Sequence, residues 1–253
     1  MYLTLLGKIM EIFNLVPDRI KFDRFWIEIK ERNIWLIRLR YAASAMLAVL
    51  TAILELLMAW GTGISANTLP LWVCTATILL YNIAFARAVR CQPEKWDPAI
   101  RFHGVVFALL QICTDFIALL AIIYFTGGVE TPFYVFFVFH IIIGSLILPG
   151  SVVVTLLVAV VCTTLAAAIA ELNGLIPHNG IEGLLQTPLY NNELYVAIFF
   201  TFFSLTLFIS IYLANSIAKS LYQREYELTL AYSELENAER DKSRYVRSVV
   251  HDL

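Results

Sequence analysis

The sequence predicts an all-α membrane protein with six transmembrane helices, the last of which continues into a cytoplasmic, parallel, dimeric coiled coil. Three observations support this class. Of the 253 residues, 60% are apolar and 15% charged, which is more apolar surface than a soluble core of this length can hide. Six apolar stretches approach the roughly 20 residues that cross a bilayer. A charged tail without helix breakers follows the sixth stretch.

The six predicted spans make up a transmembrane domain over 35–217, preceded by a leader. The fourth span is short and meets the fifth at Pro149-Gly150, so the two are expected to form a tight helical hairpin. Residues 1–34 alternate apolar and basic side chains and are expected to form an amphipathic cytoplasmic leader on the membrane surface. The predicted spans are 35–60, 69–90, 103–126, 132–149, 151–172 and 194–217.

The basic residues predict the orientation, because Lys and Arg near membrane ends stay on the cytoplasmic side. All 18 lie before or just inside the first span, around the loop between the second and third spans, or after the sixth span. The loops at the other ends, around 61–68, 127–131 and 173–193, contain neither. Both termini are therefore expected in the cytoplasm.

The tail after the sixth span reads as a coiled coil. From Asn215 to Leu253 there is no Pro and no Gly. Alternating steps of four and three from Ile217 place apolar or aromatic residues at eight of ten positions, which is a heptad seam. Residues 218–244 are therefore expected to form a coiled-coil signal helix that passes on any movement of the sixth span. A single amphipathic helix folded back on the membrane is the alternative.

The chain ends on "YVRSVVHDL", residues 245–253, in which an aromatic Tyr245 precedes His251 by six positions and Asp252 follows it. This pattern resembles the H-box of bacterial sensor histidine kinases. The resemblance implies that 245–253 begins the dimerisation and phosphoacceptor helix. It also implies that His251 attacks the γ-phosphate of ATP while Asp252 acts as the general base that orients the imidazole. An ordinary surface histidine is the alternative for His251.

In that family a second helix and an ATP-binding domain follow the H-box, and these 253 residues contain no nucleotide-binding motif. We therefore expect the membrane sensor of a two-component histidine kinase of the bacterial cytoplasmic membrane, with ATP used only by a catalytic domain outside this chain. Whether the chain is an enzyme by itself stays open. The expected partners are a second copy, a response regulator acting through the full-length kinase, and membrane lipids or a quinone. Neither nucleic acid nor a metal is expected.

The stretch "YFTGGVETPFYVFFVFH", 124–140, is the predicted sensing region. Gly127-Gly128 and Pro132 predict a tight turn before the fourth span. Aromatic and polar side chains then recur on one helical face. The predicted ligand-binding residues are Gly127, Gly128, Thr131, Pro132, Phe133, Phe136, Phe137, His140 and Asp115.

The same stretch resembles the GGxxNPF motif of the Reg/Prr redox-responsive histidine kinases, which also have six spans and are associated with ubiquinone. Gly127, Gly128, Pro132 and Phe133 match the motif, and Thr131 stands where the motif has Asn. The resemblance implies a quinone as the ligand. A plain hairpin turn with aromatic residues at the membrane interface is the alternative.

Glu55, Asp115 and His140 are ionisable residues that lie inside predicted spans. A charge in hydrocarbon is costly, so each needs a partner or a wet pocket. Asp115 and His140 lie at similar depth in adjacent spans and are expected to face each other, either lining a ligand pocket or forming a structural hydrogen bond. Two other functions remain open: a small proton- or ion-coupled transporter or channel lined by these three residues, and a scaffold that only dimerises.

Overall fold

The computed structural model describes residues 23–90 and 98–251, and the named elements of the described chain are all helices joined by irregular loops. Its β content is one isolated bridge, between Ser65 and Glu182. Two short 3₁₀ turns connect α4 to α5. The elements are α2 (Asp23–Ala59), α3 (Leu69–Arg90), α4 (Pro98–Phe125), η1 (Gly128–Glu130), η2 (Pro132–Tyr134), α5 (Val135–Ile147), α6 (Gly150–Leu172) and α7 (Glu193–His251).

Five of the described helices, α2, α3, α4, α6 and α7, contain a segment long and apolar enough to cross a membrane. The chain is therefore a multi-pass, all-helical membrane protein. The fourth predicted span, 132–149, is the exception, because its apolar helix covers only Pro132–Ile147. The 13 residues of α5 rise about 20 Å, less than the roughly 30 Å of a hydrocarbon core.

Both ends of α5 have a local cause. Thr131 caps η2, where its side chain accepts a hydrogen bond from the Phe133 N–H, and Pro132 occupies the first turn. At the other end, Leu148 is extended, with φ −101° and ψ 152°. This is the conformation that a following proline favours, and here the next residue is Pro149.

Part of the expected leader is helical. α2 begins at Asp23 and runs without a break through position 34 into the first predicted span. The remainder of the leader, residues 1–22, lies outside the described residues.

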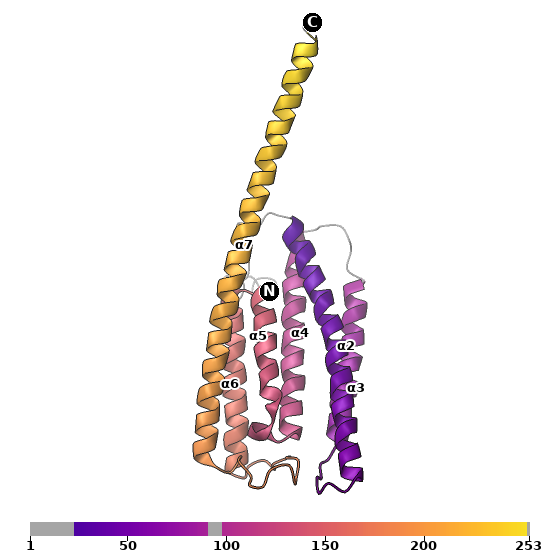
Figure 1. Ribbon diagram of the computed structural model, residues 1–253, viewed down its shortest axis with the longest axis vertical. Helices are drawn as coiled ribbons and strands as arrows, with labels where there is room; N and C mark the ends of the chain where they lie inside the picture. The colour runs from indigo at the N-terminus through magenta and orange to yellow at the C-terminus, as the bar shows by residue number, and fades with distance from the viewer. Residues whose placement is uncertain (1–22, 91–97, 252–253) are drawn as a thin grey trace, which may run out of the picture.

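The helices form a bundle from which α7 projects as one long helix (Figure 1). α2 packs on α3, α5 packs on α7, and α4 contacts α2, α3 and α5. The largest apolar core lies among α4, α5, α6 and α7, and it includes the fully buried Phe137, Leu157 and Leu207. α7 has 59 residues and is therefore about 90 Å long.

The loops before α3, η1 and α7 meet at one end of the bundle, opposite the projecting part of α7 (Figure 1). We call this the loop end. Gly127 and Gly128 lie there with φ of 113° and 55°, which is the left-handed region where glycine carries no Cβ penalty. This turn reverses the chain between α4 and α5.

Candidate functional site

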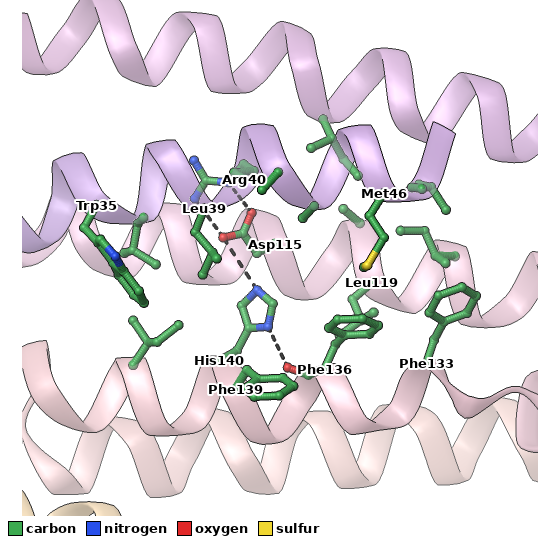
Figure 2. Close-up of a pocket in the computed structure, with 18 of the residues that line it drawn as sticks. Trp35, Leu39, Arg40, Met46, Asp115, Leu119, Phe133, Phe136, Phe139 and His140 are labelled. Carbon is green, nitrogen blue, oxygen red and sulfur yellow. Dashed lines mark hydrogen bonds and ion pairs between the residues drawn. The ribbon is translucent and has the colours of Figure 1, made fainter. Parts of the chain in front are cut away.

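A cavity of about 550 Å³ lies between α2 and α5, with residues of α3 and α4 completing its wall. Its lining is almost entirely apolar (Figure 2). Several lining side chains are also largely exposed at the bundle surface, among them Trp35, Leu39, Met46 and Phe139. The cavity is therefore a groove that is open at the bundle surface, along a helix with the length and hydropathy of a membrane span. We call it the groove.

Aromatic side chains of η2 and α5 form one wall of the groove. Phe133 stacks on Phe136 with ring centroids 5.9 Å apart and planes 27° apart. The Phe136 and Phe139 centroids are 6.1 Å apart. This spacing of three residues places the rings along one side of the helix and gives a surface suited to a flat ring.

A buried ion pair closes one side of the groove. Arg40 of α2 donates from Nε to Asp115 Oδ1 and from Nη2 to Asp115 Oδ2, both at 2.7 Å. The two side chains are 4% and 8% exposed. This is a two-pronged pair between a planar guanidinium and a carboxylate, the strongest arrangement for these groups.

Neutral side chains complete the coordination of the guanidinium. Nη1 of Arg40 donates to Asn82 Oδ1 at 2.8 Å and to Gln111 Oε1 at 3.2 Å, and Nη2 donates to Gln111 Oε1 at 3.3 Å. Gln111 in turn donates to Asn33 Oδ1 at 3.0 Å. A charge at membrane depth is tolerated only with such partners, and here all five N–H groups of the guanidinium have one.

His140 and Tyr81 bring the network to the groove surface. The Tyr81 hydroxyl donates to Asp115 Oδ1 at 2.8 Å. His140 Nε2 lies 3.8 Å from Asp115 Oδ2, and its Nδ1 lies 2.8 Å from the Phe136 carbonyl oxygen (Figure 2). We call Arg40, Tyr81, Asp115 and His140 the polar end of the groove. The arrangement suits an amphipathic ligand with an apolar body and one polar group.

The predicted binding residues separate into three places. Asp115, His140, Phe133 and Phe136 line the groove. Phe137 lies elsewhere: it is fully buried in the core, against Phe116, Tyr134 and Phe203. Gly127, Gly128, Thr131 and Pro132 form the turn that positions Phe133.

Arg40, Tyr81 and Phe139 were not among the predicted site residues. In the sequence, Arg40 is one of the basic residues that lie before or just inside the first predicted span. A signal was available, because Arg40 lies inside the predicted span 35–60, and Asn82 and Gln111 lie inside the second and third spans. Polar residues within several spans indicate a shared network.

A second polar cluster lies at the loop end. His178 Nε2 is 3.4 Å from Glu130 Oε2, and His178 Nδ1 is 3.8 Å from Glu171 Oε1. Glu130 Oε1 also accepts from the backbone N–H groups of Leu189 at 2.6 Å and Tyr190 at 3.0 Å. The cluster therefore ties the turn before α5 to the loop that leads into α7.

The remaining predicted residues lie away from the groove. Glu55 accepts hydrogen bonds from Thr68 and Trp72 at the loop end, and it is not part of the groove lining, which includes Asp115. His251 is the last residue of α7, and Asp252 lies outside the described residues. The described ranges contain no group of three or more His, Cys, Asp or Glu residues arranged to hold a metal ion.

Comparisons with protein-family models, curated proteins and solved structures gave no match to this chain.

Proposed function

We propose that this chain is the membrane sensor and signal-transmission part of a two-component histidine kinase. Its signal is a lipophilic ligand that binds in the groove, and a quinone is the leading candidate. Binding there controls the phosphorylation of His251 by a catalytic domain outside this chain. A response regulator then receives the phosphate from the full-length kinase.

The observation that carries this proposal is the position of α5 between the groove and α7. Phe133 and Phe136 face the groove. Tyr134, next to them in sequence, packs on α7 instead, with its ring centroid 4.8 Å from that of Phe199 and 4.9 Å from that of Phe203. A ligand that shifts α5 therefore pushes on α7 through packed rings, which move as discrete units rather than deforming.

α7 provides the connection to His251. It is a single α-helix from Glu193 to His251, with no flexible segment to absorb a displacement. A change imposed at Phe199 or Phe203 thus reaches the far end of the helix. His251 would be the phosphoacceptor, and Asp252 would orient its imidazole.

The tail supports a dimeric arrangement. The seam residues Leu221, Leu228 and Leu235 are 51%, 60% and 64% exposed. These residues recur every seven positions, which is the spacing that two parallel helices bury against each other. A second copy of the chain is the partner that this pattern fits. The distribution of the basic residues supports a cytoplasmic position for this tail and for the N-terminus, and the membrane that we propose is the bacterial cytoplasmic membrane.

Phosphorylation tests the proposal. The chain is joined at Leu253 to an ordinary histidine-kinase catalytic core and reconstituted in vesicles. Phosphate on His251 is then followed while a quinone pool is switched between oxidised and reduced. We expect a redox-dependent change that Phe133→Ala abolishes, with His251→Gln as the variant that accepts no phosphate.

Two results would count against the proposal. If phosphorylation of His251 does not depend on the redox state of the quinone pool, the quinone assignment is wrong but the kinase assignment stands. If the catalytic core is active but His251 stays unphosphorylated, the assignment of His251 as the phosphoacceptor is wrong.

A further inference from the structure

We propose that the polar end of the groove selects a ligand that donates a hydroxyl hydrogen bond. The groove would then bind a lipophilic phenol, such as a hydroquinone, more tightly than the matching ether or quinone. This inference rests on the proposed role of the groove as a ligand site, and it adds the chemical class of the ligand.

The donors at the polar end are already occupied. Arg40 uses its five N–H groups on Asp115, Asn82 and Gln111. The single hydroxyl hydrogen of Tyr81 goes to Asp115 Oδ1. Neither side chain therefore has a hydrogen left for a ligand.

His140 presents an acceptor. Its Nδ1 lies 2.8 Å from the Phe136 carbonyl oxygen, and a carbonyl oxygen only accepts, so Nδ1 must carry the hydrogen. In a neutral imidazole the other nitrogen, Nε2, then has a free lone pair. Nε2 is the atom directed toward Asp115 (Figure 2).

Asp115 adds a second acceptor beside the first. Its Oδ1 accepts from Arg40 and from Tyr81, whereas its Oδ2 accepts only from Arg40 Nη2 among the described residues. A carboxylate oxygen accepts two hydrogen bonds, so Oδ2 keeps one position. This position faces His140 Nε2 at 3.8 Å, too far for a hydrogen bond between them.

Two neighbouring lone pairs discriminate between ligands. A hydroxyl group supplies the hydrogen that they lack. A quinone carbonyl or an ether oxygen brings only further lone pairs and loses its own hydration, which is unfavourable in an apolar site. The stacked rings of Phe133 and Phe136 favour a hydroxyl on an aromatic ring over one on a flexible chain.

One other side-chain donor lies in the described lining, the indole N–H of Trp35. Trp35 precedes Arg40 by five residues on α2, which is about 7.5 Å of helix rise. It therefore lies more than one helical turn from Arg40, on the side away from Phe133 (Figure 2), and it would contact a phenol and its ether alike.

A matched pair of ligands tests the inference. A long-chain alkylphenol and its O-methyl ether are titrated into the full chain in lipid nanodiscs, and ubiquinol and ubiquinone are titrated in parallel. We expect the phenol and the ubiquinol to bind about five- to tenfold more tightly than their partners, the effect of one net hydrogen bond. Equal affinities within the phenol pair, or tighter binding of the ether, overturn the inference.

Two further outcomes separate the inference from the proposed function. If Phe136→Ala weakens the binding of neither ligand pair, the groove is not a ligand site. The proposed sensing function is then wrong as well. If ubiquinol and ubiquinone differ while phenol and ether bind equally, the site recognises the quinone ring, and hydroxyl selection is wrong.

Variants test whether the polar end causes the preference for a hydroxyl ligand. His140→Phe removes the acceptor and should reduce the phenol-to-ether ratio to about one. Phe139→Leu, a groove change without a polar atom, should weaken both ligands and leave the ratio intact. Tyr81→Phe frees a second acceptor position on Asp115 and should raise the ratio, which gives a test that does not depend on the folding of His140→Phe. An unchanged ratio in both His140→Phe and Tyr81→Phe contradicts the assignment.

Discussion

The Arg40 guanidinium and the Asp115 carboxylate are joined by two hydrogen bonds of 2.7 Å inside the helical bundle. Arg40 belongs to α2 and Asp115 to α4, so the pair ties together two of the helices that border the groove. The same pair holds the acceptor oxygen that faces His140. It therefore contributes both to the packing of the bundle and to the lining of the groove.

Breaking this pair on one side should destabilise the protein strongly. Arg40→Met leaves the Asp115 carboxylate buried without its counter-charge, which costs about 3–5 kcal/mol. The double variant Arg40→Met/Asp115→Leu removes both charges and should be clearly more stable than Arg40→Met alone. Unfolding of the purified variants in detergent measures this. A double variant no more stable than the single one would contradict the role of the pair.

Phe137 and Phe139 should behave differently although they are two residues apart. Phe137 is fully buried between α5 and α7, whereas Phe139 is 53% exposed. Phe137→Ala leaves a core cavity and should lower the free energy of unfolding by about 3 kcal/mol or more. Phe139→Ala should cost far less and should weaken ligand binding. Equal losses of stability would show that the core is not organised around Phe137.

Gly128 should tolerate alanine less well than Gly61. Both have positive φ, 55° and 70°, so each substitution carries a backbone cost of about 1–2 kcal/mol. At Gly128 an added Cβ would also clash with Glu171 Oε2, whereas at Gly61 it would meet no atom within 4 Å. Gly128→Ala should therefore be the more destabilising, and adding Glu171→Ala should recover part of the loss in a thermal melt.

Glu130 should anchor the loop before α7. Its carboxylate accepts the N–H groups of Leu189 and Tyr190, so Glu130→Ala should raise amide hydrogen exchange at these two positions. Glu182 bonds instead to the Ser65 hydroxyl, and Glu182→Ala provides the control. Unaltered exchange at Leu189 and Tyr190 in Glu130→Ala would show that the backbone alone holds the loop.

A charge introduced into the tail should disrupt pairing of two copies only at a seam position. Leu228→Glu places a charge on the seam and should abolish cross-linking between two copies in vesicles. Leu230 is 43% exposed but off the seam, so Leu230→Glu should leave cross-linking intact. If both variants cross-link as well as the unaltered chain, the coiled-coil proposal fails.

Much of the helix plan follows from hydropathy alone. α3 coincides with the predicted span 69–90, and α6 begins one residue before the predicted 151–172. These ends are marked by local chemistry, such as Pro149 before α6, that does not depend on tertiary neighbours. α5 was predicted as a full span because its apolar run continues to Pro149, but the 3₁₀ turn at Pro132 and the extended Leu148 shorten the helix.

The site was less predictable, because it depends on which helices become neighbours. At 100° per residue, Phe137 lies within about 60° of Phe133 around the helix axis, and Phe139 lies about 60° from Phe136. A helical face that includes Phe133 and Phe136 can therefore equally include Phe137 or Phe139. Only the packing of α5 on α7 decides that Phe137 is core and Phe139 is groove. Likewise, the pairing of Arg40 with Asp115 is a contact between α2 and α4, which periodicity within either segment cannot reveal.

The most direct test of the account fills the groove covalently and reads phosphate on His251. In the chimera with a catalytic core, the four native cysteines are replaced by alanine and Met46→Cys is introduced in the groove lining, to be labelled with a phenyl maleimide. Val49→Cys, which is 58% exposed on the same helix and outside that lining, is the control. We expect labelling at position 46 to change His251 phosphorylation and labelling at position 49 to leave it unchanged. Complete labelling at position 46 with unchanged phosphorylation would contradict the proposed function.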